Sequence, residues 1–130
     1  MSRAVVLALV GVLVVGGCGG DDGGPSAAPA EGCHKAEAGT VAIVAADLAW
    51  DTDCLEAPAG RPVTIVVDNR DEGVNHNIHL RDAPGKPKTQ LEAGPVTQSL
   101  EVDLPAGSYE YICDIHPNML GTLRVTAVQG

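Results

Sequence analysis

The chain has little positive charge. Its 8 Lys and Arg residues stand against 17 Asp and Glu residues, which gives a formal net charge of −9 over 130 residues. Nucleic acids and anionic lipid surfaces are bound through clustered Lys and Arg, so this balance argues against both as direct partners. A basic or neutral protein partner is favoured, although an acidic surface also serves solubility.

The chain also lacks an apolar run that is long enough for a membrane-spanning helix. The run from Ala4 to Val15 falls short of the ~20 residues that a bilayer requires, and two glycines end it. With Arg3 in front and small residues behind, the run is typical of an export signal. We therefore expect residues 1–17 to be a signal peptide.

Low-complexity sequence follows this run. Residues 19–32, GGDDGGPSAAPAEG, combine Gly, Pro, Ala and acidic residues without apolar periodicity, so they cannot bury enough surface to fold. We interpret residues 18–32 as a flexible tether and residues 33–130 as the folded domain. Roughly 100 residues suffice for one hydrophobic core, and no internal repeat points to a second unit.

No helical stripe is visible after residue 40, where apolar residues alternate with polar ones instead. In the last such segment Leu123, Val125 and Ala127 alternate with polar residues, as expected when one face of a sheet is buried. Short alternating segments separated by turn sequences predict an all-β fold, an antiparallel β-sandwich or small barrel. The expected strands are residues 40–46, 61–69, 75–80, 97–104, 107–113 and 121–128, with a long loop at 81–96.

Two of the expected strands direct reactive side chains toward the core. In the NHNIHL strand the inward-facing set begins with His76, while Asn77 and His79 fall on the opposite face. In the GSYEYIC strand the set that contains the tyrosines ends in Cys113. His76 and Cys113 are therefore candidates for one interior point, and His79 is expected at the surface.

His116 and Met119 follow Cys113 at three-residue intervals in the sequence CDIHPNM. Together with His76 these residues offer one thiolate, two imidazoles and one thioether, and soft donors of this kind select copper over calcium, magnesium or manganese. Two His and one Cys with a weak axial Met are the ligand set of a blue-copper electron-transfer site, whereas zinc gains little from Met. The alternatives are that Cys113 is a buried, inert thiol and that Met119 only fills the core.

NHNIHL followed by GSYEYICDIHPNMLGTLRV resembles the cupredoxin family, and the Cys-x-x-His-x-x-Met loop is similar to the short loop of amicyanins and other small cupredoxin domains. The resemblance covers residues 40–128. It implies a Greek-key β-sandwich that holds one copper ion, as Cu(I) or Cu(II), on His76, Cys113, His116 and Met119.

The same resemblance implies supporting residues around the ligands. Asn77 matches the family asparagine that braces the ligand loop through hydrogen bonds and so orients the ligands. The chain departs from the family pattern at Asn75, where proline is usual, and at Asp114, where serine or threonine is common. The second departure bears on the Asn77 brace and on the reduction potential.

The cysteines outside the CDIHPNM loop can be interpreted through two resemblances. VGGC, which ends at Cys18, resembles the lipobox of bacterial lipoproteins and implies a lipid-anchored protein on the extracytoplasmic face of the cell membrane, held there by lipid alone. If Cys18 carries lipid and Cys113 carries copper, Cys33 and Cys54 remain. An oxidising compartment favours a disulfide between these two over two free thiols.

Family resemblance implies a monomeric one-electron carrier that docks with a redox partner protein. The docking surface would be an apolar patch around His116, here Val74, Pro117 and Leu120. With the same ligands, copper binding for delivery or for protection against excess copper is the alternative.

An enzyme such as a copper oxidase is not expected. That chemistry needs further copper centres with additional histidines, and only His34 and His79 remain outside the candidate site.

Overall fold

The computed structural model describes residues 32–128, and the regular elements of this part are all β-strands. Their bounds are β1 His34–Lys35, β2 Thr40–Ala46, β3 Ala49–Trp50, β4 Cys54–Pro58, β5 Val63–Asn69, β6 Asn75–His76, β7 His79–Leu80, β8 Glu92–Ala93, β9 Val96–Val102, β10 Gly107–Cys113 and β11 His116–Thr126. Within these residues no helix is long and apolar enough to cross a membrane. The predicted signal peptide, the Cys18 lipidation site and nearly all of the predicted tether lie outside the described residues.

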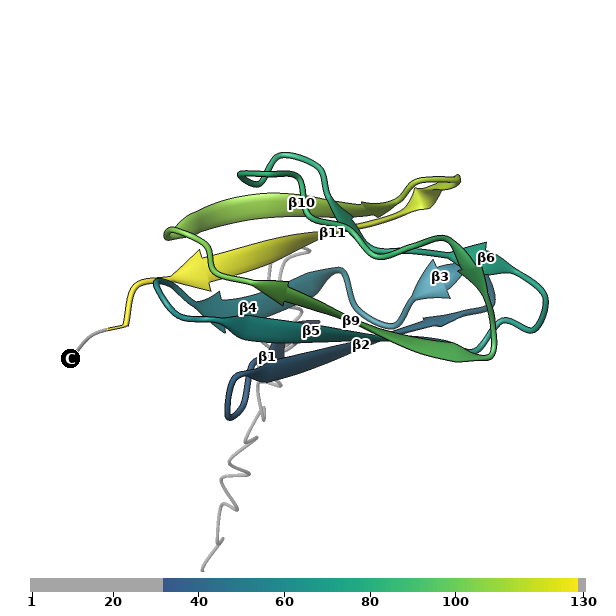
Figure 1. The fold of residues 1–130 in the computed structure, drawn as a ribbon, viewed down its shortest axis with the longest axis horizontal. Helices are drawn as coiled ribbons and strands as arrows, with labels where there is room; N and C mark the ends of the chain where they lie inside the picture. Colours follow the sequence, from purple (N-terminus) through teal and green to yellow (C-terminus); the bar gives the residue numbers. More distant parts are fainter. Residues whose placement is uncertain (1–31, 129–130) are drawn as a thin grey trace, which may run out of the picture.

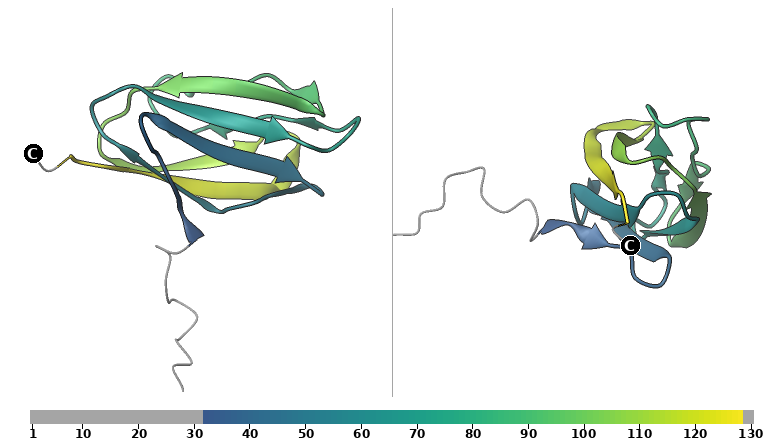
Figure 2. Two further views of the ribbon diagram at one scale, coloured as in Figure 1. Left: turned by 90° about the horizontal axis from the view of Figure 1, so that it is seen from below. Right: turned by 90° about the vertical axis from the view of Figure 1, so that its left-hand side faces the viewer.

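The strands form two packed layers (Figures 1 and 2). A five-stranded sheet has the order β1-β4-β11-β10-β7, and a four-stranded sheet has the order β3-β2-β5-β9. A short β6-β8 ladder closes one end of the sandwich, and the turn between β10 and β11 lies at this same end (Figure 1). The C-terminus lies at the opposite end.

Both sheets are mixed, so the prediction of a purely antiparallel sandwich is wrong in this respect. β2 pairs with β5 in parallel, and β4 pairs in parallel with both β1 and β11. The β5–β9 and β10–β11 pairs are antiparallel. Alternation of apolar and polar residues reports which face of a strand is buried, but it carries no information on the direction of the neighbouring strand.

The predicted strand segments are largely present. β2 and β10 have the predicted bounds, whereas the predicted 75–80 strand is interrupted between β6 and β7, and β11 begins at His116 rather than at residue 121. β4 was missed because its last residues begin the sequence APAG, which is typical of a turn. The missed strands β1, β3 and β8 have two residues each, too few to show alternation.

The hydrophobic core lies between the two large sheets, and the predicted alternation identifies most of its side chains correctly. Leu123 and Val125 are buried, whereas Ala127 lies beyond the end of β11 and is exposed. Tyr111 is fully buried and its hydroxyl donates to the carbonyl of Thr52 at 2.8 Å. Its ring covers Gly121 on the paired strand, where any Cβ would collide with the ring.

The predicted disulfide is present and joins Cys33 to Cys54 across a sequence separation of 21 residues. It ties the segment before β1 to the first residue of β4. Closing a loop of this size stabilises the fold by about 3 kcal/mol on the loop-entropy model.

Candidate metal centre

The three-residue spacing of the loop results from a tight hairpin. Cys113 ends β10, His116 begins β11, and the two residues face each other across the hairpin. The preceding pair is Ile112 with Leu120, so three residues of β11 between these pairs have no partner on β10. Such an irregularity bends the strand and re-aims its side chains, which is how Met119 reaches the same interior region as Cys113.

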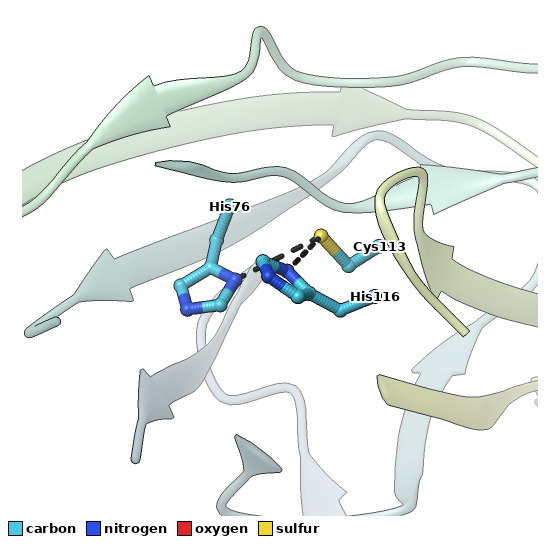
Figure 3. A group of neighbouring side chains, drawn as sticks. All are labelled: His76, Cys113 and His116. Carbon is cyan, nitrogen blue, oxygen red and sulfur yellow. Dashed lines mark hydrogen bonds between the residues drawn. The ribbon is translucent and has the colours of Figure 1, made fainter. Parts of the chain in front are cut away.

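The side chains of His76, Cys113 and His116 converge (Figure 3). The Cys113 Sγ atom lies 3.4 Å from Nδ1 of His116 and 3.8 Å from Nδ1 of His76. The two imidazole rings are tilted against each other with centroids 4.7 Å apart. Three donor atoms from three strands therefore face one point.

Most of this cluster is shielded from solvent. His76 is 0% exposed, Cys113 2% and Met119 1%, while His116 is only partly buried. Met119 packs with Cys113 and Ala45 in a small apolar cluster, against which Trp50 also packs. The arrangement therefore has three buried donors and one donor that reaches the surface.

The donor set fits one copper ion. The nitrogen and sulfur atoms of His76, Cys113 and His116 lie within 4.8 Å of one another. Atoms bound to one ion at roughly 2.0–2.3 Å stand roughly 3–4 Å apart, so this cluster needs little rearrangement to bind a metal. A thiolate, two imidazole nitrogens and an adjacent thioether are the chemistry that copper prefers.

Asp71, which the sequence analysis did not identify, supports His76 from behind. Its Oδ2 atom lies 2.7 Å from Nε2 of His76, on the side of the ring away from Cys113. Backbone N–H groups of Asp47 and Leu48 also donate to this carboxylate, at 2.6 and 3.0 Å. The bond from Leu48, followed by that from His76, holds the pKa of Asp71 below its usual value against the opposing effect of burial.

Asn77 and Asp114 form the brace that the family resemblance implies, in a reciprocal form. The Asp114 N–H donates to Oδ1 of Asn77 at 2.9 Å, and Nδ2 of Asn77 donates back to Oδ2 of Asp114 at 2.8 Å. Asn77 is 1% exposed, because this part of the predicted strand is irregular and lies under the ligand loop. The aspartate therefore preserves the brace.

His79 is not the solvated surface residue that its strand position predicts. Its side chain is only 18% exposed and its Nδ1 atom lies 2.8 Å from Oδ1 of Asp114. Burial raises the pKa of Asp114. The hydrogen bonds from His79 and Asn77 and the charge of Lys88, 3.9 Å away, lower this pKa by more than burial raises it, so the net shift is downward. His34 is the other histidine outside the candidate site. Its Nδ1 atom lies 2.9 Å from the backbone carbonyl of Ala42, on β2 of the opposite sheet.

Fold and donor set together define a small β-sandwich metal protein with a Cys, His and Met centre at one end. The chain belongs to the cupredoxin family, because a family model described as a Cupredoxin-like domain matches residues 25–125. Amicyanin-alpha of Methylorubrum extorquens strain AM1 is 33% identical over 100 residues, which are 73% of this chain and 79% of amicyanin-alpha.

Solved structures show the same fold. An auracyanin from the photosynthetic bacterium Roseiflexus castenholzii has a TM-score of 0.60 at 18% identity, over 70% of this chain and 99% of its own. Auracyanin B has a TM-score of 0.59 at 26% identity, over 70% of this chain and 91% of its own. A reduced amicyanin mutant has a TM-score of 0.53 at 26% identity, over 70% of this chain and 86% of its own.

These similarities confirm the predicted family, the sandwich fold and the cofactor. Cupredoxins are in general small copper proteins of electron transfer, and copper is the cofactor of this chain.

Proposed function

We propose that this protein is a one-electron carrier that holds its copper ion on His76, Cys113, His116 and Met119. The observation that supports this most directly is the convergence of Nδ1, Sγ and Nδ1 atoms within 4.8 Å of one another in a largely buried cluster. A bound copper ion would supply the Cu(I)/Cu(II) couple.

The chain's part in this function is to keep the donors in place in both oxidation states. His76 is held by Asp71, and the loop that carries Cys113 is held by the reciprocal Asn77 and Asp114 bonds. Partners of this kind orient ligands and fix which ring nitrogen faces the metal. A centre that rearranges little on reduction exchanges electrons with a small barrier.

His116 is the ligand through which an electron would leave, because it is the one of the four that is partly exposed. Ile115 and Leu120, on either side of it in sequence, are 49% and 50% exposed, and Pro117 is exposed as well. Exposed apolar side chains in the segment that carries a candidate ligand point to a contact surface. We propose this surface as the docking site for a redox partner protein. Of the three residues predicted to form the apolar patch, Pro117 and Leu120 are exposed and Val74 is half-buried.

The test of the copper site is titration of the purified protein with Cu(II), followed by absorption and electron paramagnetic resonance spectroscopy. We expect an intense thiolate-to-copper absorption that Cys113→Ser removes. A protein that stays colourless with Cu(II) contradicts the proposal.

Copper delivery is the second candidate for the same ligands, and burial argues against it. His76, Cys113 and Met119 are at most 2% exposed, so a copper acceptor could reach only His116 directly. We therefore expect slow loss of Cu(I) to a soluble chelator together with fast electron exchange. Rapid loss of Cu(I) would favour delivery instead.

For the location we propose export and attachment to the extracytoplasmic face of the membrane through lipid on Cys18. The Cys33–Cys54 disulfide supports export, since disulfides persist in oxidising compartments. Expression in a bacterium with a labelled fatty acid tests the anchor, and Cys18→Ser should abolish labelling and release the protein from the membrane fraction. Equal labelling of both forms would exclude Cys18.

A further inference from the structure

The Asp71 carboxylate occupies an unusual position for a side chain in a turn sequence. Its side chain is 13% exposed and accepts from the His76 ring and from two backbone N–H groups. Asp71 is itself held in place, because its own N–H donates to Oδ1 of the buried Asn69 at 3.0 Å. The carboxylate is thus fixed in position before it meets the imidazole.

This contact decides which nitrogen of His76 carries the proton. An ionised carboxylate only accepts hydrogen bonds, so Nε2 of His76 must be protonated to donate to Asp71 at 2.7 Å. In the neutral ring Nδ1 then has a free lone pair. Nδ1 is the atom that faces Cys113, as Figure 3 shows.

The same carboxylate is linked to the ligand loop through a second route. It accepts from the N–H groups of Asp47 and Leu48, which both have left-handed backbones with φ of 53° and 59°. The carbonyl of Leu48 in turn accepts a hydrogen bond from Nδ2 of Asn118 at 3.1 Å. Asn118 lies between the candidate ligands His116 and Met119.

We propose that Asp71 is a positioning residue of the copper centre. Its carboxylate holds His76 in the Nε2–H tautomer, presents an unprotonated Nδ1 to the metal, and connects this ligand to the turn that also holds the His116–Met119 loop. A carboxylate behind the ring makes the imidazole a more basic donor, which favours Cu(II) over Cu(I). This inference rests on the proposed copper site.

The first test uses the full wild-type protein without metal. Nitrogen-15 NMR of the histidine rings distinguishes the two tautomers, and we expect His76 as Nε2–H with an unprotonated Nδ1. At a pH high enough for the ring to be neutral, a proton on Nδ1 instead of Nε2 overturns the proposal. Since this measurement needs neither copper nor a variant, it remains decisive if the copper site itself fails its own test or if a variant fails to fold.

The second test compares Asp71→Asn with Glu72→Gln. Both variants remove one negative charge at neighbouring positions, but Glu72 is exposed and its side chain is not part of this network. We expect Asp71→Asn to weaken Cu(II) binding roughly 10–100-fold, as is typical when a partner behind a metal-binding histidine is lost. The affinity for Cu(I) should fall less than the affinity for Cu(II). Each tenfold fall in the ratio of the Cu(II) affinity to the Cu(I) affinity raises the reduction potential by about 59 mV.

A purely structural role for Asp71 would give a different pattern. If Asp71 serves only to cap the 47–48 turn, Asp71→Asn lowers the urea midpoint, while the His76 tautomer and the reduction potential change no more than in Glu72→Gln. That outcome overturns the proposal. A potential shift in Asp71→Asn that clearly exceeds the shift in Glu72→Gln supports it.

Discussion

At the scale of single residues, the side chain at position 114 shows how one substitution can reorganise a site without removing it. Serine or threonine there would give one hydroxyl to the Asn77 brace. Asp114 instead uses two oxygens, one on Asn77 and the other on His79, while its N–H still reaches Asn77. His79 thereby contacts the residue that directly follows Cys113 in the sequence.

Asp114→Ser should destabilise the fold and raise the reduction potential. Loss of the two carboxylate bonds costs about 1–2 kcal/mol of unfolding free energy, and removal of a negative charge next to Cys113 disfavours Cu(II) relative to Cu(I). Urea unfolding and voltammetry measure the two effects. His79→Gln is the matched control, because it removes the imidazole that contacts Asp114 and keeps both bonds between Asn77 and Asp114. An equal rise in the reduction potential of this variant would show that the charge of Asp114 is not the cause.

At the scale of elements, β4 connects the strand that carries His116 and Met119 with the disulfide at Cys33. It pairs with β11 in parallel, from Thr122 to Thr126, and so supports the strand on which His116 and Met119 are carried. Its first residue, Cys54, is bound to Cys33. The disulfide therefore attaches the chain's N-terminal side to the sheet that holds the ligand loop, at residues other than the ligands.

Removal of this disulfide should lower stability and leave the copper spectrum unchanged. The double variant Cys33→Ala with Cys54→Ala is expected to lose about 3 kcal/mol of unfolding free energy, because its unfolded chain is no longer cross-linked. Urea unfolding of the metal-free protein measures the loss. The absorption of the copper form is the internal control, and a loss of this absorption would mean that the bridge also shapes the site.

At the scale of the whole molecule, the sandwich separates the copper end from the end that carries the C-terminus (Figure 1). Exposed apolar side chains occur at both ends, Ile115 and Leu120 beside His116 and Val128 near the C-terminus. Only the first group adjoins a ligand. Electron transfer should therefore depend on one end of an otherwise acidic molecule.

Leu120→Asp should slow electron exchange much more than Val128→Asp. The two side chains are equally exposed, at 50% and 51%, and both substitutions add one negative charge, so overall charge is matched. A charge in the apolar surface beside His116 must be desolvated on docking, whereas one at the far end stays in water. Self-exchange between reduced and oxidised copies, followed by NMR line broadening, measures the rates; equal slowing would place the docking surface elsewhere.

Much of this protein can be predicted from local sequence because much of it depends on local physics. Alternation marks β2, β5, β9, β10 and most of β11, together with the inward direction of Cys113 and His76, and the CDIHPNM sequence itself contains three of the four candidate donors. Tertiary structure alone decides the parallel pairing of β2 with β5, the break after His76 and the contact between Asp71 and His76. These features depend on which distant segments become neighbours, and a carboxylate in a turn looks the same in sequence whether it faces water or an imidazole.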